Sequence, residues 1–272
     1  MSLATESHKH LVLGMAIGYT AKQLKPFVFS LKETGYDGET VFIISQAETD
    51  PDSIEALRSW GITLVPYEAW RFMPTCIHVT RYIKYYEFLL DGYYDYILLT
   101  DTKDVIFQKN PFCIDKSQEL YFFAEDPGIT IGTCLSNAQW VKSAFGTEML
   151  AALYHKRISC GGTTMGSYQG IIKYLMAMVE IIGIANPASL KVIGVDQAFH
   201  HVIIYDKIIK DYCLMDNQKH INTMCRVPQD GVSLADDVTI VNADGTVSPI
   251  VHQYDYSPHE KICAAVLKKY YH

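Results

Sequence analysis

The chain has 272 residues, a length that suits one large domain or two small ones joined tightly. It carries 23 Lys and Arg against 30 Asp and Glu, a formal net charge of −7, so no nucleic-acid partner is expected, because neutralising phosphates needs a basic surface. Hydrophobic residues make up 49% and charged residues 19%, which allows a large core and excludes intrinsic disorder, collagen, a coiled coil and a disulfide-dense miniprotein.

The seven cysteines are scattered, and none forms a Cys-x-x-Cys pair. This pattern argues against a zinc site and indicates free, mostly buried thiols in a reducing compartment. The apolar residues 11–18 lack the small-x-small cleavage site of a secretory signal, so they are read as a first strand. The apolar residues 171–185 are too few to span a bilayer and include two charged residues. We therefore expect a cytoplasmic protein without a transmembrane segment.

Hydrophobic periodicity predicts alternating strands and helices in the first hundred residues. The predicted strands cover residues 10–17, 40–45, 62–66 and 94–100, and the predicted helices cover residues 27–34, 52–60 and 78–90. The first helix is expected to begin after Pro26, a residue that suits the first turn. This alternation is typical of an α/β fold with a mostly parallel central sheet flanked by helices, whose ligands bind beyond the carboxyl ends of the strands.

The second half of the chain is less regular. Strands are predicted at residues 120–124, 238–241 and 250–252, and helices at residues 136–145, 169–183 and 195–205. No repeat, low-complexity tract or Pro/Gly/Ser-rich linker is visible in the sequence. We therefore expect a single domain over residues 1–272 with two lobes, covering about residues 10–112 and 113–272.

The sharpest chemical signal is Asp101-Thr-Lys-Asp104, which follows the predicted strand 94–100. Two carboxylates at the end of a buried strand offer hard oxygen ligands to Mn²⁺ or Mg²⁺, and such an ion can hold a diphosphate. The alternative is a polar turn in which Asp101 caps the next segment.

Four further blocks accompany this motif, and together they resemble nucleotide-sugar-dependent glycosyltransferases of the GT-A (Rossmann-like) fold. The DXD motif of these enzymes is similar to Asp101–Asp104 with one residue added. Their glycogenin-like and galactosyltransferase-like retaining members also carry segments similar, in the same order, to Arg81-Tyr-Ile-Lys84-Tyr-Tyr-Glu87, Cys160-Gly161-Gly162-Thr163, Val195-Asp196-Gln197-Ala198 and Ile250-Val251-His252-Gln253-Tyr254. The ordered set covers roughly residues 10 to 261.

The resemblance implies a metal site, a donor site and a catalytic pair. Mn²⁺ or Mg²⁺ would be held by Asp101, Asp104 and His252. The nucleotide-sugar donor would contact residues of the first lobe and of later segments, namely Ala16, Gly18, Tyr19, Arg81, Lys84, Asp101, Thr102, Gly161, Gly162, His259 and Lys261. The second lobe would bind the acceptor, and its last segment would supply the metal histidine.

The expected activity is transfer of a sugar from a nucleotide-sugar donor to a hydroxyl of a glycan, a lipid-linked sugar or a protein. A UDP-sugar is the expected donor. Asp196 and Gln197 are the expected catalytic residues. Asp196 would be the base of an inverting enzyme, whereas in a retaining enzyme, the favoured case, Gln197 would lie beneath the anomeric carbon. An alternative role for Asp196 is as N-cap of the helix that follows.

The sequence departs from the family pattern at several positions. Ala198 stands where a second acid is expected, Ser159 or Cys160 replaces an asparagine, and Pro258 falls where a lysine binds the diphosphate, so that His259 or Lys261 would take over that role. These departures keep two alternatives open, a non-catalytic sugar- or partner-binding protein on the same fold and a sugar nucleotidyltransferase.

Aromatic rings commonly stack on the faces of sugars. The candidates for such contacts are Trp70, Phe72 and Trp140, and Trp140 is expected on the acceptor side.

Overall fold

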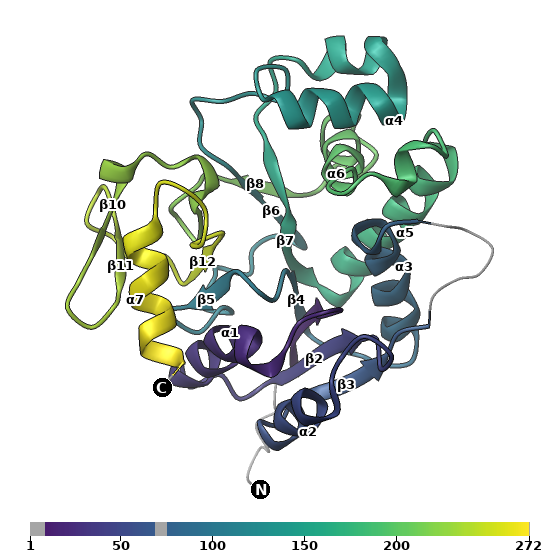
Figure 1. Ribbon diagram of the computed structural model, residues 1–272. Helices are drawn as coiled ribbons and strands as arrows, with labels where there is room; N and C mark the ends of the chain where they lie inside the picture. Colours follow the sequence, from purple (N-terminus) through teal and green to yellow (C-terminus); the bar gives the residue numbers. More distant parts are fainter. Residues whose placement is uncertain (1–8, 69–74, 272) are drawn as a thin grey trace, which may run out of the picture.

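Apolar runs from both halves of the chain form a seven-stranded sheet in the computed structural model, which describes residues 9–68 and 75–271 (Figure 1). The strand order is β3-β2-β1-β4-β7-β6-β8. β7 runs antiparallel to both of its neighbours, and the other pairs are parallel, so the prediction of an α/β fold with a mostly parallel sheet is confirmed. The strands are β1 (His10–Met15), β2 (Glu39–Ile44), β3 (Thr63–Pro66), β4 (Tyr96–Thr100), β6 (Leu120–Ala124), β7 (Ser159–Ser167) and β8 (Cys213–Met215).

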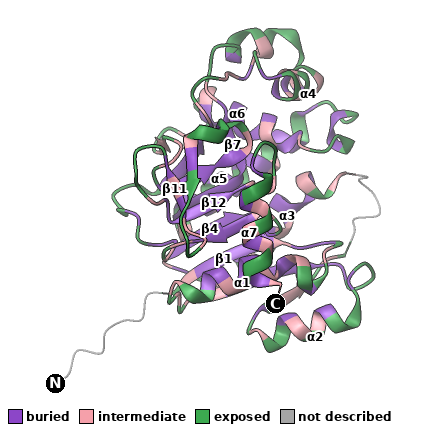
Figure 2. Ribbon diagram, turned by 60° about the vertical axis from the view of Figure 1, so that its left-hand side comes forward, coloured by how far each residue is buried: buried purple, intermediate pink, exposed green. Residues whose placement is uncertain are grey.

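Helices cover both faces of this sheet because successive strand side chains point to opposite faces. Along β1, Leu11 and Leu13 pack in a core with α3, α5 and α6, whereas Val12 packs in a second core with α1 and α2. Figure 2 shows the strands as a buried layer between partly exposed helices. The helices are α1 (Ala21–Glu33), α2 (Pro51–Ser59), α3 (Ile77–Leu90), α4 (Leu135–Leu153), α5 (Tyr168–Ile184), α6 (Asp196–Tyr205) and α7 (Glu260–Tyr270).

A small second sheet brings the C-terminal segment beside the central sheet. It consists of β5 (Val105–Phe107), β12 (Ile250–His252) and β9 (Ile221–Thr223), with β12 in the middle. A third core joins this sheet to α7 and to the hairpin of β10 (Val232–Leu234) and β11 (Ile240–Asn242). Because β5 follows the central strand β4 after only four residues, its partner β12 is held at the carboxyl end of β4.

Two predicted helices have different limits in the structure. α1 begins at Ala21 rather than after Pro26, because Thr20 and Gln23 form a reciprocal capping box that starts the helix earlier. Pro26 therefore lies inside the helix. α4 continues to Leu153, past a break at Gly146, whose φ of 88° only glycine adopts readily.

Periodicity also missed several elements. The strands β5, β8, β9 and β10 have three residues each, too few for a period to show. The strand predicted at residues 238–241 corresponds to β11, which begins at Ile240 and pairs with β10. Helix α7 was not predicted.

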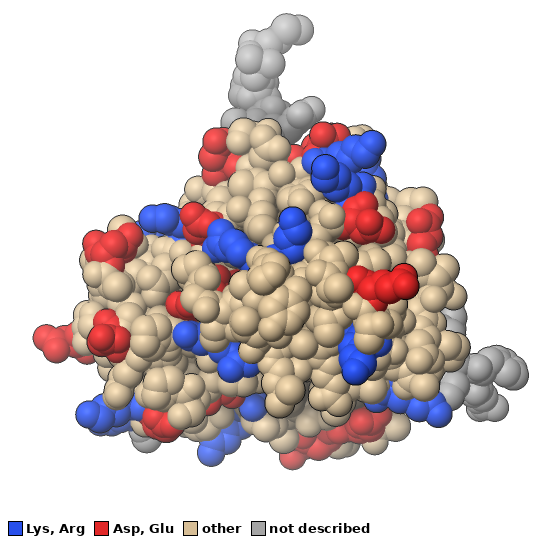
Figure 3. All heavy atoms as spheres, turned by 90° about the horizontal axis from the view of Figure 1, so that it is seen from above, with Lys and Arg blue, Asp and Glu red and all other residues tan. Residues whose placement is uncertain are grey.

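All seven cysteines are free, as expected, but only Cys134 and Cys160 are buried, so the expectation of mostly buried thiols is wrong. Within residues 9–68 and 75–271, no helix has both the length and the apolar character needed to cross a bilayer. On the face shown in Figure 3, acidic and basic side chains are interspersed, and neither sign covers it.

Candidate metal centre and the cleft around it

The two acidic residues of the central motif lie in the loop between β4 and β5. The Asp101 backbone N–H donates to the Gly162 carbonyl over 2.8 Å, and the Thr102 hydroxyl donates to the Met15 carbonyl over 3.0 Å. These bonds tie the loop to β7 and β1, the neighbours of β4. The loop is thus fixed at the carboxyl edge of the central strands, where ligands of such sheets bind.

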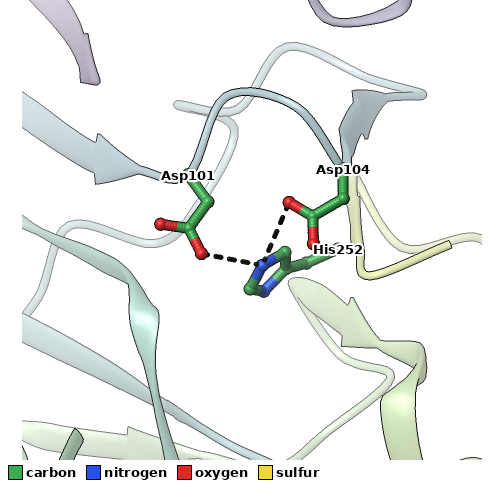
Figure 4. Close-up of side chains that lie close together, drawn as sticks. All are labelled: Asp101, Asp104 and His252. Carbon is green, nitrogen blue, oxygen red and sulfur yellow. Dashed lines mark ion pairs between the residues drawn. The ribbon is translucent and has the colours of Figure 1, made fainter. Parts of the chain in front are cut away.

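His252 comes from the far end of the chain and reaches the same point. β12 pairs with β5 so that His252 lies opposite Val105, and the next backbone N–H, of Gln253, donates to the Asp104 carbonyl over 2.8 Å. The His252 Nε2 lies 3.3 Å from Asp101 Oδ2 and 3.7 Å from Asp104 Oδ1 (Figure 4). One ligand atom from each of the three residues lies within 4.8 Å of the other two.

These three side chains fit a divalent cation. The His252 ring is buried, and its Nε2 makes no regular hydrogen bond to the part of the chain that the structure describes. The approach is close enough that a β-carbon at position 162 would lie 2.6 Å from His252 Cε1 and overlap the Asp101 carboxylate, so glycine is needed there. Two carboxylate oxygens and one imidazole nitrogen suit Mn²⁺ better than Mg²⁺, because Mg²⁺ prefers oxygen ligands and retained water.

The three groups shift one another's protonation. Burial raises the pKa of Asp104 to about 6, and the neighbouring Asp101 charge adds to this rise. Burial also acts to raise the pKa of Asp101, but the Arg81 guanidinium and His252 hold it below its usual range. Burial acts to lower the pKa of His252, but Cys160 and the two carboxylates raise it well above its usual value. Without a cation, the carboxylates and Cys160 therefore favour the protonated form of this imidazole.

Cys160 contacts the other nitrogen of the same imidazole. Its Sγ lies 3.3 Å from His252 Nδ1, and both side chains are buried. When Nδ1 carries the proton and shares it with this sulfur, Nε2 presents its lone pair toward Asp101 and Asp104. The sequence identified Cys160 only as a replacement for asparagine, and this contact was not predicted.

Arg81 and Asp196 form the second charged group of the cleft. Arg81 donates to Asp196 Oδ2 over 2.6 Å and also forms an ion pair with Asp101. The Tyr82 hydroxyl lies 3.2 Å from the same Asp196 oxygen and donates to the Gly161 carbonyl over 3.0 Å. Val195, not Asp196, is the N-cap of α6, so the N-cap alternative for Asp196 is wrong.

Gln197 is held by two residues that the sequence analysis did not single out. Its Nε2 donates to Glu125 Oε1 and to Asn137 Oδ1, each over 3.1 Å, and its Oε1 accepts from the Gly161 N–H at 3.4 Å. Burial raises the pKa of Glu125. Glu125 follows the predicted strand at residues 120–124, and an acid at the end of a buried strand was a signal that could have identified it.

The structure brings most of the predicted site residues to one cleft with a volume of about 350 Å³. The predicted residues that line it come from seven separate segments, namely Tyr19, Arg81, Asp101, Thr102, Asp104, Trp140, Gly162, Asp196, Gln197 and His252. Gly161 takes part through its carbonyl, which accepts from Arg81 over 3.2 Å. The convergence of Asp101 with Asp104, and of both with Asp196 and Gly162, was predicted.

Other predicted donor contacts lie elsewhere among the described residues. Ala16 is fully buried, and its N–H bonds to Ile43, while Gly18 is exposed next to Tyr19. Lys84 pairs with Glu87 on α3 and does not line the cleft.

His259 is buried with its ring against the Val227 carbonyl, because the segment after β9 packs on α7. Lys261 is exposed on α7, and Trp70 and Phe72 lie outside the described residues.

Comparison of the sequence with protein-family models and with curated proteins found no match in either set.

Proposed function

We propose that this protein is a metal-dependent glycosyltransferase of GT-A type that moves a sugar from a nucleotide-sugar donor, a UDP-sugar in the first instance, to a hydroxyl acceptor. The observation that carries the proposal is the convergence of Asp101, Asp104 and His252, separated by up to 151 positions, on one point at the edge of β4. The resemblance drawn from sequence blocks requires this meeting of distant segments, whereas an isolated acidic turn does not. Arg81 and Gln197 beside it supply polar groups in the same cleft.

The chemistry of glycosyl transfer explains why such a centre is needed. A divalent ion held by Asp101, Asp104 and His252 would neutralise the diphosphate leaving group as the anomeric bond breaks. Tyr19, in the loop between β1 and α1, offers a ring on which the nucleotide base can stack. Arg81 forms ion pairs with two carboxylates. Its role in this proposal is therefore to hold Asp101 and Asp196 in place, rather than only to bind phosphate.

The surroundings of Asp196 favour retention over inversion. One of its oxygens is already engaged by Arg81 and Tyr82, and the whole residue is only 2% exposed. A base that deprotonates an acceptor hydroxyl must reach that hydroxyl at hydrogen-bond distance. Gln197, oriented by Glu125 and Asn137, lines the cleft and is the better candidate to lie beneath the anomeric carbon.

The test is the release of UDP. The protein is incubated with UDP-sugars, GDP-sugars and CMP-sugars, each with Mn²⁺ or with a chelator, and free nucleotide is measured. Metal-dependent release from one donor class supports the proposal, and Asp104→Asn abolishes that release. Asp230→Asn, at an exposed turn, is the matched control and leaves release unchanged.

A non-catalytic sugar-binding protein is the second candidate. It is favoured by Ala198, which is fully buried and carries no acid where the resemblance expects one. That candidate predicts saturable binding of nucleotide sugar with Mn²⁺ but no release of nucleotide with any acceptor. Absence of both binding and release contradicts both candidates.

A further inference from the structure

The lining of the cleft contains a group of apolar side chains among its polar ones. On the side of β5 and β12, left of β4 in Figure 1, it is formed by charged and polar side chains, including Lys103, Gln253 and Asp255. On the side of α3 and α6, the polar side chains of His78, Arg81, Asp196 and Gln197 are joined by three large side chains without a charge, those of Ile77, Trp140 and Ile193. These three residues are called the apolar rim below.

The apolar rim is open to solvent. Ile193 is 70% exposed and Ile77 is 39% exposed, although both line the cleft. Large aliphatic side chains that are exposed in a concave site contribute little to the free energy of folding. Such side chains typically contact an apolar part of a ligand.

The rim is held together by specific contacts between three chain segments. The Cys76 N–H donates to the Leu190 carbonyl over 2.9 Å, and the Cys76 thiol donates to the Val192 carbonyl over 3.3 Å, which joins the start of α3 to the segment before α6. Trp140 packs on Gly194, where φ is +85° and a β-carbon would lie 2.8 Å from the indole Cη2. The rim is thus a built surface rather than a chance cluster.

The rim is continuous with the reacting end of the cleft. Ile193 and Gly194 precede Val195, the N-cap of α6, and the first residues of this helix, Asp196 and Gln197, line the same cleft. A molecule seated on the rim therefore has its hydrocarbon part on Ile77, Trp140 and Ile193 and its other end beside Gln197. The three rim residues offer a hydroxyl-rich oligosaccharide only one side-chain hydrogen-bond donor, the indole N–H of Trp140, and the polar cleft residue next to them in the chain is His78.

We infer that the acceptor is a hydroxyl-bearing group, such as a sugar, joined directly to a hydrocarbon chain or ring, and that the apolar rim binds this hydrocarbon. The inference rests on the proposed function and names the class of acceptor for the same site. Burial of each methylene group is worth about fourfold in affinity, so the length of the hydrocarbon should control binding until the rim is covered.

The experiment measures binding of methyl, butyl and octyl β-glucoside by calorimetry, below their micelle concentrations, to protein loaded with Mn²⁺ and UDP. The wild-type protein is expected to bind more tightly by about fourfold per added methylene over the first few carbons. Ile193→Asp removes this dependence on chain length. Ile184→Asp, which changes an isoleucine that is 76% exposed on α5 and outside the cleft lining, keeps the dependence.

Three results overturn the inference: equal affinity for all three glucosides, no measurable binding of any of them, or an unchanged dependence in Ile193→Asp. Failure of the proposed function looks different, because Mn²⁺ and UDP then do not bind even in the absence of glucoside.

A last experiment compares binding of octyl glucoside with binding of lipid vesicles that carry a glycolipid. Binding of the glucoside alone identifies a soluble acceptor, and added retention on the vesicles identifies a membrane-borne one, each in agreement with the inference.

Discussion

Arg81 and Asp196, 115 positions apart in the chain, form a buried ion pair with 2.6 Å between Nη2 and Oδ2. Their side chains are 10% and 3% exposed. Because Arg81 also pairs with Asp101, this one guanidinium connects the start of α6 to the loop that carries the candidate metal ligands.

Removing the guanidinium should therefore cost stability as well as site geometry. Arg81→Met leaves a buried carboxylate without its counter-charge, and we expect a loss of about 3–5 kcal/mol in the free energy of unfolding. Urea unfolding measures it, and Arg58→Met, at an exposed position on α2, is the matched control with no measurable loss. A loss in Arg81→Met no larger than in the control would show that the pair is not structurally important.

Gly162 should be required for metal binding because any side chain there overlaps Asp101 and crowds His252. We expect Gly162→Ala to weaken Mn²⁺ binding by about 10- to 100-fold, the range found when groups that position metal ligands are changed. Gly183→Ala is the control, since its β-carbon meets no atom within 4 Å on α5 and alanine favours a helix. Calorimetry should show unchanged Mn²⁺ affinity in the control; equal affinities in both variants would contradict the crowded geometry.

Cys160 should act on metal affinity through His252. Cys160→Val keeps a buried apolar side chain but removes the partner of Nδ1, so the imidazole loses the contact that directs Nε2 to the metal. We expect Mn²⁺ to bind about tenfold more weakly or worse in Cys160→Val, with a smaller loss in Cys160→Ser, which retains a polar partner. Wild-type affinity in both variants would remove Cys160 from the account.

Buried neutral histidines should make the fold sensitive to acid. The His220 Nε2–H donates to the Pro111 carbonyl over 2.7 Å, and burial lowers the pKa of His220 to about 4. The unfolded chain binds this proton near pH 6.5 and the folded chain only near pH 4, so the stabilisation is complete above pH 6.5 and is lost as the pH falls toward 4. The slope per histidine is about 1.4 kcal/mol per pH unit.

The variant His220→Gln isolates this contribution, because glutamine can donate to the same carbonyl without titrating. The free energy of unfolding of this variant is measured in urea between pH 7 and pH 4.5. It should fall with decreasing pH less steeply than that of the wild type, and the two slopes should differ by about 1.4 kcal/mol per pH unit, the value for one proton. Asp104, with its raised pKa, acts in the opposite direction but equally in both proteins. Parallel curves would contradict the account.

Local patterns in the sequence predicted what depends on neighbouring residues. The strand that ends at Thr100 and the acids that follow it are adjacent in the chain, so their place at the sheet edge follows from topology. The pairing of Arg81 with Asp196 depends on how α3, β7 and α6 pack, and no spacing encodes it. His259 shows the converse, because a histidine near the metal ligand in sequence is turned into the core by its bond to Val227.

The central claim is that Asp101, Asp104 and His252 hold one divalent cation, and calorimetric titration of Mn²⁺ in the presence of UDP tests it most directly. We expect wild-type protein to bind Mn²⁺ at a single site, His252→Ala and Asp104→Asn to bind more weakly by over about tenfold, and both variants to remain folded. Because Asp104 has a pKa of about 6 and that of His252 is raised, both must lose protons to bind the ion, so wild-type affinity should fall as the pH drops below 7. Wild-type affinity in His252→Ala, or an affinity that does not change between pH 7.5 and 5.5, would contradict the account.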